Sequence, residues 1–206
     1  MRVLAIPAVF VAIISAVTGV VGMAAVPSSN AHSSASPIAS PLASPQATST
    51  LNPRITPPPT SCQGASTWRD DTARRLSGLN DAANDVDQLL NAAANAPLSN
   101  YDEENRLRAT AQRHATALNK AATEQRSSSP PPAGKELNTR LVEVLTAYAD
   151  LMDTLRQVFG ASGNYILVDA LKYKVVDAYT AANMVAAAAS DDVTVFLDRC
   201  GDPKTV

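Results

Sequence analysis

The stretch that decides the fold is LNTRLVEVLTAYADLMDTLRQV, residues 137–158. Its large apolar residues recur at alternating intervals of three and four positions, which places their side chains on one face of an α-helix. Polar and charged residues occupy most of the remaining positions, so this segment predicts an amphipathic helix that buries one face. The residues expected on that face are Leu137, Leu141, Val144, Tyr148, Leu151, Leu155 and Val158.

Three further segments, 76–93, 107–121 and 168–196, carry apolar or small residues at the same helical spacing. Connections that contain proline or glycine separate the four segments, and short connections make consecutive helices antiparallel neighbours. The sequence therefore predicts an all-α fold, an antiparallel up-down-up-down four-helix bundle. The core positions expected on these three helices are Leu76, Leu79, Ala83, Val86, Leu90 and Ala93; Leu107, Ala111, His114, Leu118 and Ala121; and Val168, Leu171, Val175, Ala178, Ala182, Val185, Ala189 and Phe196.

Signals for helix ends and for helix register refine this prediction. Thr67 and Ser99 each precede an aspartate by three residues, as N-cap residues do, and Asp191–Asp192 is interpreted as a kink or a restart of the last helix.

Basic residues seven apart in the second helix and acidic residues seven apart in the third predict ion pairs across an antiparallel hairpin. The expected pairs are Arg106 with Asp150, Arg113 with Glu143, and Lys120 with Glu136.

The part of the chain before the helices predicts export and a spacer. Arg2 followed by an apolar run to Val26 is the layout of an export signal, and the run is also long enough to span a bilayer. Residues 1–26 are therefore either a cleaved export signal or an uncleaved signal-anchor. Residues 27–60 are mostly Ser, Pro, Ala and Thr, which predicts a disordered linker, either a plain spacer or a glycosylated stalk.

These boundaries assign the four-helix bundle to residues 61–202 and leave a short tail at 203–206. Either reading of the N-terminal segment places the bundle outside the cytoplasm, secreted or at the cell surface. Contact with a membrane is expected only through residues 3–26, if that segment is not cleaved.

The chain has two cysteines, Cys62 and Cys200, one before the first predicted helix and one at the end of the last. An up-down-up-down bundle brings these two positions to the same end, and exported proteins favour disulfides. The sequence therefore predicts a Cys62–Cys200 disulfide. In the predicted register Trp68, rather than Cys62, is level with Cys200, so the segment that carries Cys62 is expected to fold back over that end of the bundle.

The sequence offers little that indicates catalysis. Nucleotide-binding, serine-nucleophile and metalloprotease motifs do not occur, so we expect no enzyme, no metal site and no cofactor. His114 is the one histidine in the helical region, and Tyr165, Tyr173 and Tyr179 crowd the last helix. These four residues are the weak candidates for ligand binding, against the alternatives of a satisfied core histidine and of tyrosines that pack at the boundary of the core.

The charge balance narrows the class of partner. The chain has 17 basic and 19 acidic residues, a net charge of −2, which disfavours nucleic acid because such binding rests on basic charge. We therefore expect a non-enzymatic binding or structural module, displayed outside the cytoplasm, whose partner is a protein or another component of the cell envelope. The alternative is an extracytoplasmic carrier of a small ligand, haem or lipid, that uses His114 or a cavity near the tyrosines.

Overall fold

The computed structural model describes residues 60–161 and 163–201. The export segment at 1–26, the linker up to residue 59 and the tail at 203–206 lie outside the described residues. The described part is helical and contains no strand, which confirms the predicted all-α class. Its elements are the 3-10 helix η1 (Thr60–Cys62), α2 (Ala65–Arg75), α3 (Ser77–Ala94), α4 (Tyr101–Arg126), the 3-10 helix η2 (Pro132–Gly134), α5 (Lys135–Gly160) and α6 (Tyr165–Cys200).

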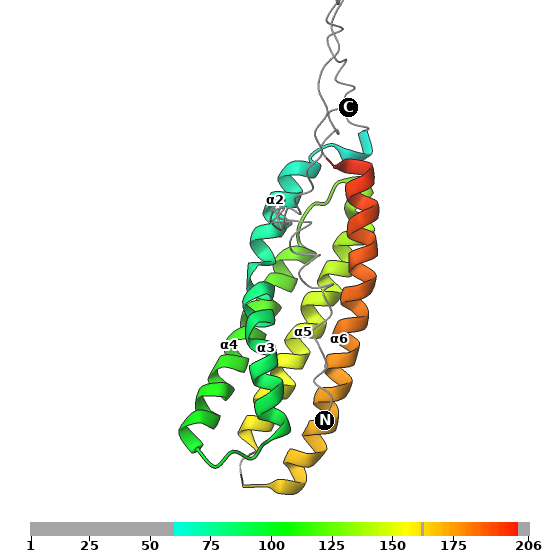
Figure 1. Ribbon diagram of the computed structural model, residues 1–206. Helices are drawn as coiled ribbons and strands as arrows, with labels where there is room; N and C mark the ends of the chain where they lie inside the picture. The colour runs from blue at the N-terminus through cyan, green and yellow to red at the C-terminus, as the bar shows by residue number, and fades with distance from the viewer. Residues whose placement is uncertain (1–59, 162, 202–206) are drawn as a thin grey trace, which may run out of the picture. The chain divides into compact units, whose positions relative to one another are not determined.

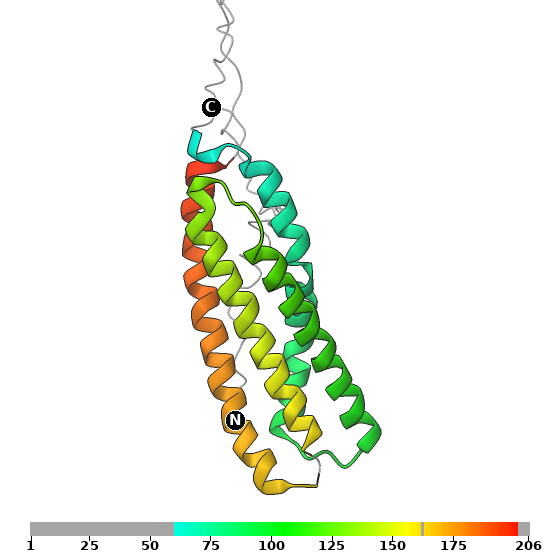
Figure 2. The same ribbon diagram turned by 180° about the vertical axis from the view of Figure 1, so that it is seen from behind.

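The helices form an antiparallel bundle in which α2 and α3 together make the first rod (Figure 1). Both views place α2 and the C-terminal end of α6 at one end, and the α3–α4 and α5–α6 connections at the other (Figures 1 and 2). Helix α5 packs against α3, α4 and α6, whereas α3 and α6 touch each other only slightly. The core therefore centres on α5.

Helix α5 buries the predicted face in full. All seven residues expected on it are buried, and five further residues of α5 join them in the core. Tyr148 is among the largest fully buried side chains, and its hydroxyl donates a hydrogen bond to Asn183 Oδ1 on α6 at 3.0 Å. Burial raises the pKa of this hydroxyl far above its usual value, with a smaller contribution from Tyr179, so the group is a neutral donor.

The ends of two predicted helices differ from the expectation. The first helix breaks at Leu76 and begins at Ala65, after Gly64 with φ of 77°, so Thr67 lies inside α2 and is not its N-cap. Helix α4 begins after Asn100, whose side-chain oxygen accepts from the backbone N–H groups of Asp102 and Glu103 at 3.0 and 3.3 Å. Ser99 is therefore not the N-cap, because its neighbour Asn100 satisfies the free N–H groups of the first turn.

The last helix is longer and more regular than predicted. It runs without interruption through Asp191–Asp192 over 36 residues, so the expected kink or restart does not occur. Ala186 and Val193 are buried on α6, whereas the predicted Ala178 and Val185 are only partly buried. A similar shift on α3 buries Ala82 and Leu89 and leaves the predicted Ala83 and Leu90 partly exposed.

The predicted ladder of ion pairs between the second and third helices is wrong. Arg106 instead pairs with Glu103 at 2.7 Å, and Lys120 lies 3.9 Å from Glu124, in each case a residue on the same helix. Gln125 Nε2 donates to Asn138 Oδ1 at 2.7 Å, but the predicted register would separate these two residues by about two turns. Helix α5 is thus displaced along α4 from the predicted register. Arg113 lies 4.0 Å from Asp85 on α3, and Glu143 pairs with Arg140.

Candidate functional site

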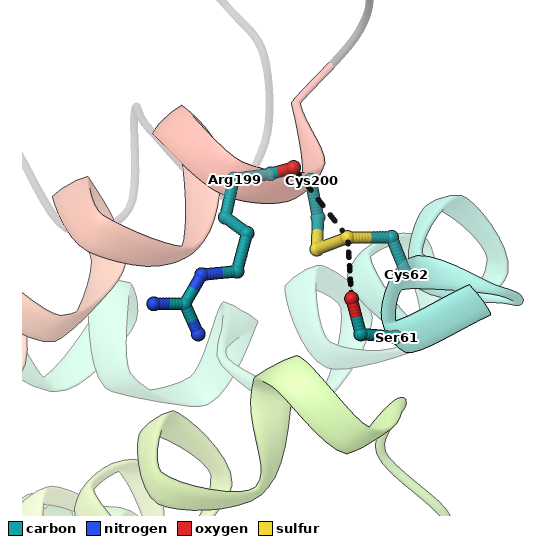
Figure 3. The surroundings of a disulfide bond; sticks show 4 residues. All are labelled: Ser61, Cys62, Arg199 and Cys200. Atoms are coloured by element: carbon teal, nitrogen blue, oxygen red, sulfur yellow. Dashed lines mark hydrogen bonds between the residues drawn. A yellow bond between two sulfur atoms is a disulfide. The ribbon is translucent and has the colours of Figure 1, made fainter. Parts of the chain in front are cut away.

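The end of the bundle that carries the cysteines is covalently closed. Cys62 in η1 and Cys200 at the end of α6 form a disulfide, with their Cα atoms 5.4 Å apart (Figure 3). The Sγ atom of Cys62 is 3.9 Å from the hydroxyl of Ser61 and 3.5 Å from the backbone carbonyl oxygen of Arg199. A cysteine pair at bonding distance is typical of proteins that fold in an oxidising compartment outside the cytoplasm.

Aromatic packing and a buried polar network lie next to this disulfide. The rings of Trp68 and Phe196 meet edge to face, with centroids 5.4 Å apart, and both residues are buried. Gln125 is fully buried between Thr72 Oγ1 at 3.2 Å and Asn138 Oδ1 at 2.7 Å. The hydrogen bonds of Gln125 join α2, α4 and α5, so these polar groups stabilise the packing of the helices.

His114 is buried and engaged by a carboxylate in this structure. It is 4 % exposed, and its Nε2 lies 2.8 Å from Asp85 Oδ2 on α3. Arg113 Nη2 lies 4.0 Å from the same carboxylate oxygen. Asp85 was not among the sequence candidates, because a residue 29 positions away on another helix gives no local signal.

The three candidate tyrosines on α6 do not converge. Tyr165 and Tyr173 are largely exposed, whereas Tyr179 is partly buried and packs against the core near Tyr148. Tyr173 and Tyr179 are six positions apart, which turns their side chains about 120° from each other on a helix. No described contact joins any of the three to His114, so the four weak candidates do not form one site.

The described residues do not outline a pocket for haem or a lipid chain. An apolar cavity between α2, α5 and α6, lined in part by Trp68, Leu141 and Phe196, measures about 10 Å³, which is about the volume that holds one water molecule. A hollow of about 310 Å³ is lined by four charged side chains, those of Asp71, Arg74, Arg75 and Glu124. Within the described residues no group of three His, Cys, Asp or Glu side chains is placed to hold a metal ion.

The most unusual surface of the described region is the outer side of α6. Of the eight large apolar residues that are exposed in the described region, all but Tyr101 lie on this helix. Four of them form a line that we call the α6 crest: Ile166, Tyr173, Met184 and Val195, which are 85, 76, 69 and 55 % exposed. Residues 7, 18 and 29 positions after the first return to within about 20° of its direction at 3.6 residues per turn, so these four apolar side chains point the same way along the helix.

The helical periodicity of α6 predicts one apolar stripe, which belongs to the core, and the crest residues lie outside that stripe. The signal was present as the spacing from Ile166 to Met184, which is 18 residues or five full turns. Tyr173 is the one crest residue that was also a sequence candidate. Val176, at 61 % exposure, widens the apolar surface beside the crest.

None of the described helices has a stretch long and apolar enough to cross a membrane. Comparisons with protein-family models, with curated proteins and with solved structures find no match for this chain.

Proposed function

We propose that this protein is a non-enzymatic binding module that works outside the cytoplasm and contacts its partner through the α6 crest. The observation that carries the proposal is the concentration of exposed apolar residues on one line of one helix. Single exposed apolar residues are common on soluble proteins, but seven of the eight large exposed ones in the described region lie on one helix. We take this concentration as the mark of an interaction surface. The hydrophobic effect favours covering such a row with another surface.

The rest of the chain supports display of this surface. The apolar N-terminal segment and the Pro/Ser/Ala/Thr-rich linker are the layout of an exported domain held away from its point of attachment. The disulfide pair agrees with an oxidising compartment. Secretion and surface attachment are thus part of the proposal, with a protein or another envelope component as partner.

The carrier alternative gains no comparable support. His114 is engaged with Asp85 at 2.8 Å, and the apolar cavity near Trp68 has a volume of about 10 Å³. A small-ligand site normally encloses several hundred Å³ within mostly apolar walls, whereas the hollow of about 310 Å³ beside Asp71 and Glu124 is lined by charged side chains. We therefore place the binding surface on the outside of the bundle.

Site-specific photo-crosslinking in the producing cell tests this function. The full chain carries the photoreactive substitution Tyr173→p-benzoylphenylalanine on the crest, and Tyr101→p-benzoylphenylalanine is the matched control, since Tyr101 is an equally exposed tyrosine on α4. We expect an adduct of discrete mass from position 173 and none from position 101. Equal adducts from both positions, or none from position 173, would refute a binding role for the crest.

A further inference from the structure

Acidic residues accompany the α6 crest along its length. Asp177 lies eleven positions after Ile166 and Asp191 lies seven after Met184, so both point within about 20° of the crest direction. Asp169 and Asp198 lie on the same side, four positions before Tyr173 and three after Val195. All four aspartates are exposed. The crest is thus an apolar line interspersed with negative charge.

Most of this charge is not compensated within the described residues. Asp169 has Lys172 at 3.7 Å, but Asp177, Asp191 and Asp198 form no ion pair with any other residue of the described ranges 60–161 and 163–201. Lys172 and Lys174 lie about 80° or more away from the crest line, on the flanks of the helix. Arg199 lies about 60° from the line, as far from it as Asp169.

The geometry of the crest indicates an elongated partner. From Ile166 to Val195 the crest spans 29 positions, or about 43 Å at the 1.5 Å rise of an α-helix. A second helix laid along it presents apolar side chains at intervals of three and four residues over the same distance. Basic side chains on the edges of that helix would then meet the aspartates.

We infer that the α6 crest binds a cationic amphipathic helix, one apolar stripe flanked by Lys or Arg; this inference rests on the function proposed above and specifies its partner. Charge complementarity selects this occupant over others. A second copy of the chain would bring the same uncompensated aspartates to both sides of the interface. An anionic membrane surface or a nucleic acid would meet like charge along the whole crest.

Binding of synthetic peptides to the full chain, followed by fluorescence anisotropy, tests the inference. The probe is an amphipathic peptide of about 29 residues, with Leu at intervals of three and four and Lys on the flanks. One control replaces every Lys by Glu, and a second scrambles the Lys peptide at constant composition. We expect the Lys peptide to bind at least about tenfold more tightly than either control, and more weakly as NaCl rises from about 50 to 500 mM, because salt screens exposed charges.

Matched protein variants identify the surface. Asp177→Asn, Asp191→Asn and Asp198→Asn combined should weaken binding of the Lys peptide about tenfold, as expected for three exposed pairs of modest energy each. Asp81→Asn, Asp87→Asn and Asp150→Asn remove the same charge from exposed sites on α3 and α5, and should change binding less than twofold.

Three outcomes of the peptide-binding measurements would overturn the inference. These are equal binding of the Lys and Glu peptides, equal binding of the scrambled peptide, and equal losses from the two triple variants. The first leaves the crest as an apolar binding surface without charge selection, so the proposed function survives it. A dimer that Tyr173→Ala disperses would assign the crest to a second copy and also contradict the cationic partner. Failure of crosslinking from position 173, in contrast, removes the function itself.

Discussion

The two faces of α6 differ in the size of their apolar side chains. The inner face is built largely from alanine and valine, such as Ala182, Ala186 and Val175, which are buried. The outer face carries larger side chains, including Ile166, Tyr173 and Met184, which are exposed. Small residues allow α6 to approach α5 closely, whereas the larger ones on the other side contribute nothing to the core.

This difference separates what holds the fold from what the surface offers. Burial of an apolar side chain stabilises the folded state in proportion to the area removed from water. The inner residues therefore determine stability, while the crest residues leave their area available for a partner. Substitutions on one helix should then fall into two classes that do not overlap.

The largest expected effect on the free energy of unfolding comes from removing the disulfide, which joins the end of α6 to the segment before α2. In the double variant Cys62→Ser and Cys200→Ser, the unfolded chain regains the freedom of a loop whose ends are 138 residues apart in sequence. The chain-entropy account gives a loss of up to about 5 kcal/mol. Urea unfolding followed by circular dichroism measures it, and a change below about 1 kcal/mol would show that Trp68 and Phe196 hold this end without the bond.

The next effect contrasts two neighbouring valines that lie on different faces. Val175 is 6 % exposed and Val176 is 61 % exposed. Val175→Ala removes two buried methyl groups and should cost about 1.5–3 kcal/mol. Val176→Ala should change the free energy of unfolding by less than about 0.5 kcal/mol.

Chemical denaturation of the two single variants under the same conditions measures this contrast, and each valine serves as the control for the other. Similar losses from both substitutions would contradict the division of α6 into a core face and a free outer face. A loss only from Val175→Ala, combined with weaker crosslinking only from Val176→Ala, would sharpen it.

The smallest expected effect concerns Tyr148, whose hydroxyl donates a hydrogen bond to Asn183 on α6. Burial raises the pKa of Tyr148 in the folded state, so the folded state keeps this proton while the unfolded state loses it above about pH 10. Stability from this group is present below that pH and declines as pH rises. The loss should reach about 1.4 kcal/mol by pH 11.

Tyr148→Phe removes the titrating group and also the hydrogen bond to Asn183. Its free energy of unfolding should be lower at neutral pH by about 1 kcal/mol, and should fall less steeply than that of the parent protein between pH 9 and about 11. Urea unfolding at a series of pH values compares the two slopes. Parallel slopes would show that Tyr148 does not cause the alkaline loss.

How much the sequence could predict depended on the contrast between neighbouring residues. In α5, Leu, Val and Tyr alternate with charged and polar residues, and every predicted core position is buried. In α6, the run from Val185 to Ala189 offers apolar residues in every direction. Periodicity could not choose the inner face there, because every position of the run is apolar. The more hydrophobic Val185 is only partly buried, whereas Ala186 is buried.

Contacts between helices were the least predictable part. The proximity of the two cysteines followed from the topology, since an even number of antiparallel helices returns the chain to its starting end. The partner of His114 did not, because Asp85 lies on another helix and the position of one helix along another depends on side chains that interlock. The crest residues also follow a helical spacing in the sequence. They can be recognised as a surface feature only once the buried face of α6 is known.

The disulfide also determines how a mechanical load would pass through the domain. Cys62 lies where the linker enters and Cys200 lies at the end of α6, the helix that carries the crest. In the function proposed above, a pull between an anchored linker and a partner on α6 would run from Cys62 through the S–S bond directly into α6. Helices α2 to α5 would bear little of that force, so the covalent link would let the domain hold a partner under tension while most of the bundle stays unloaded.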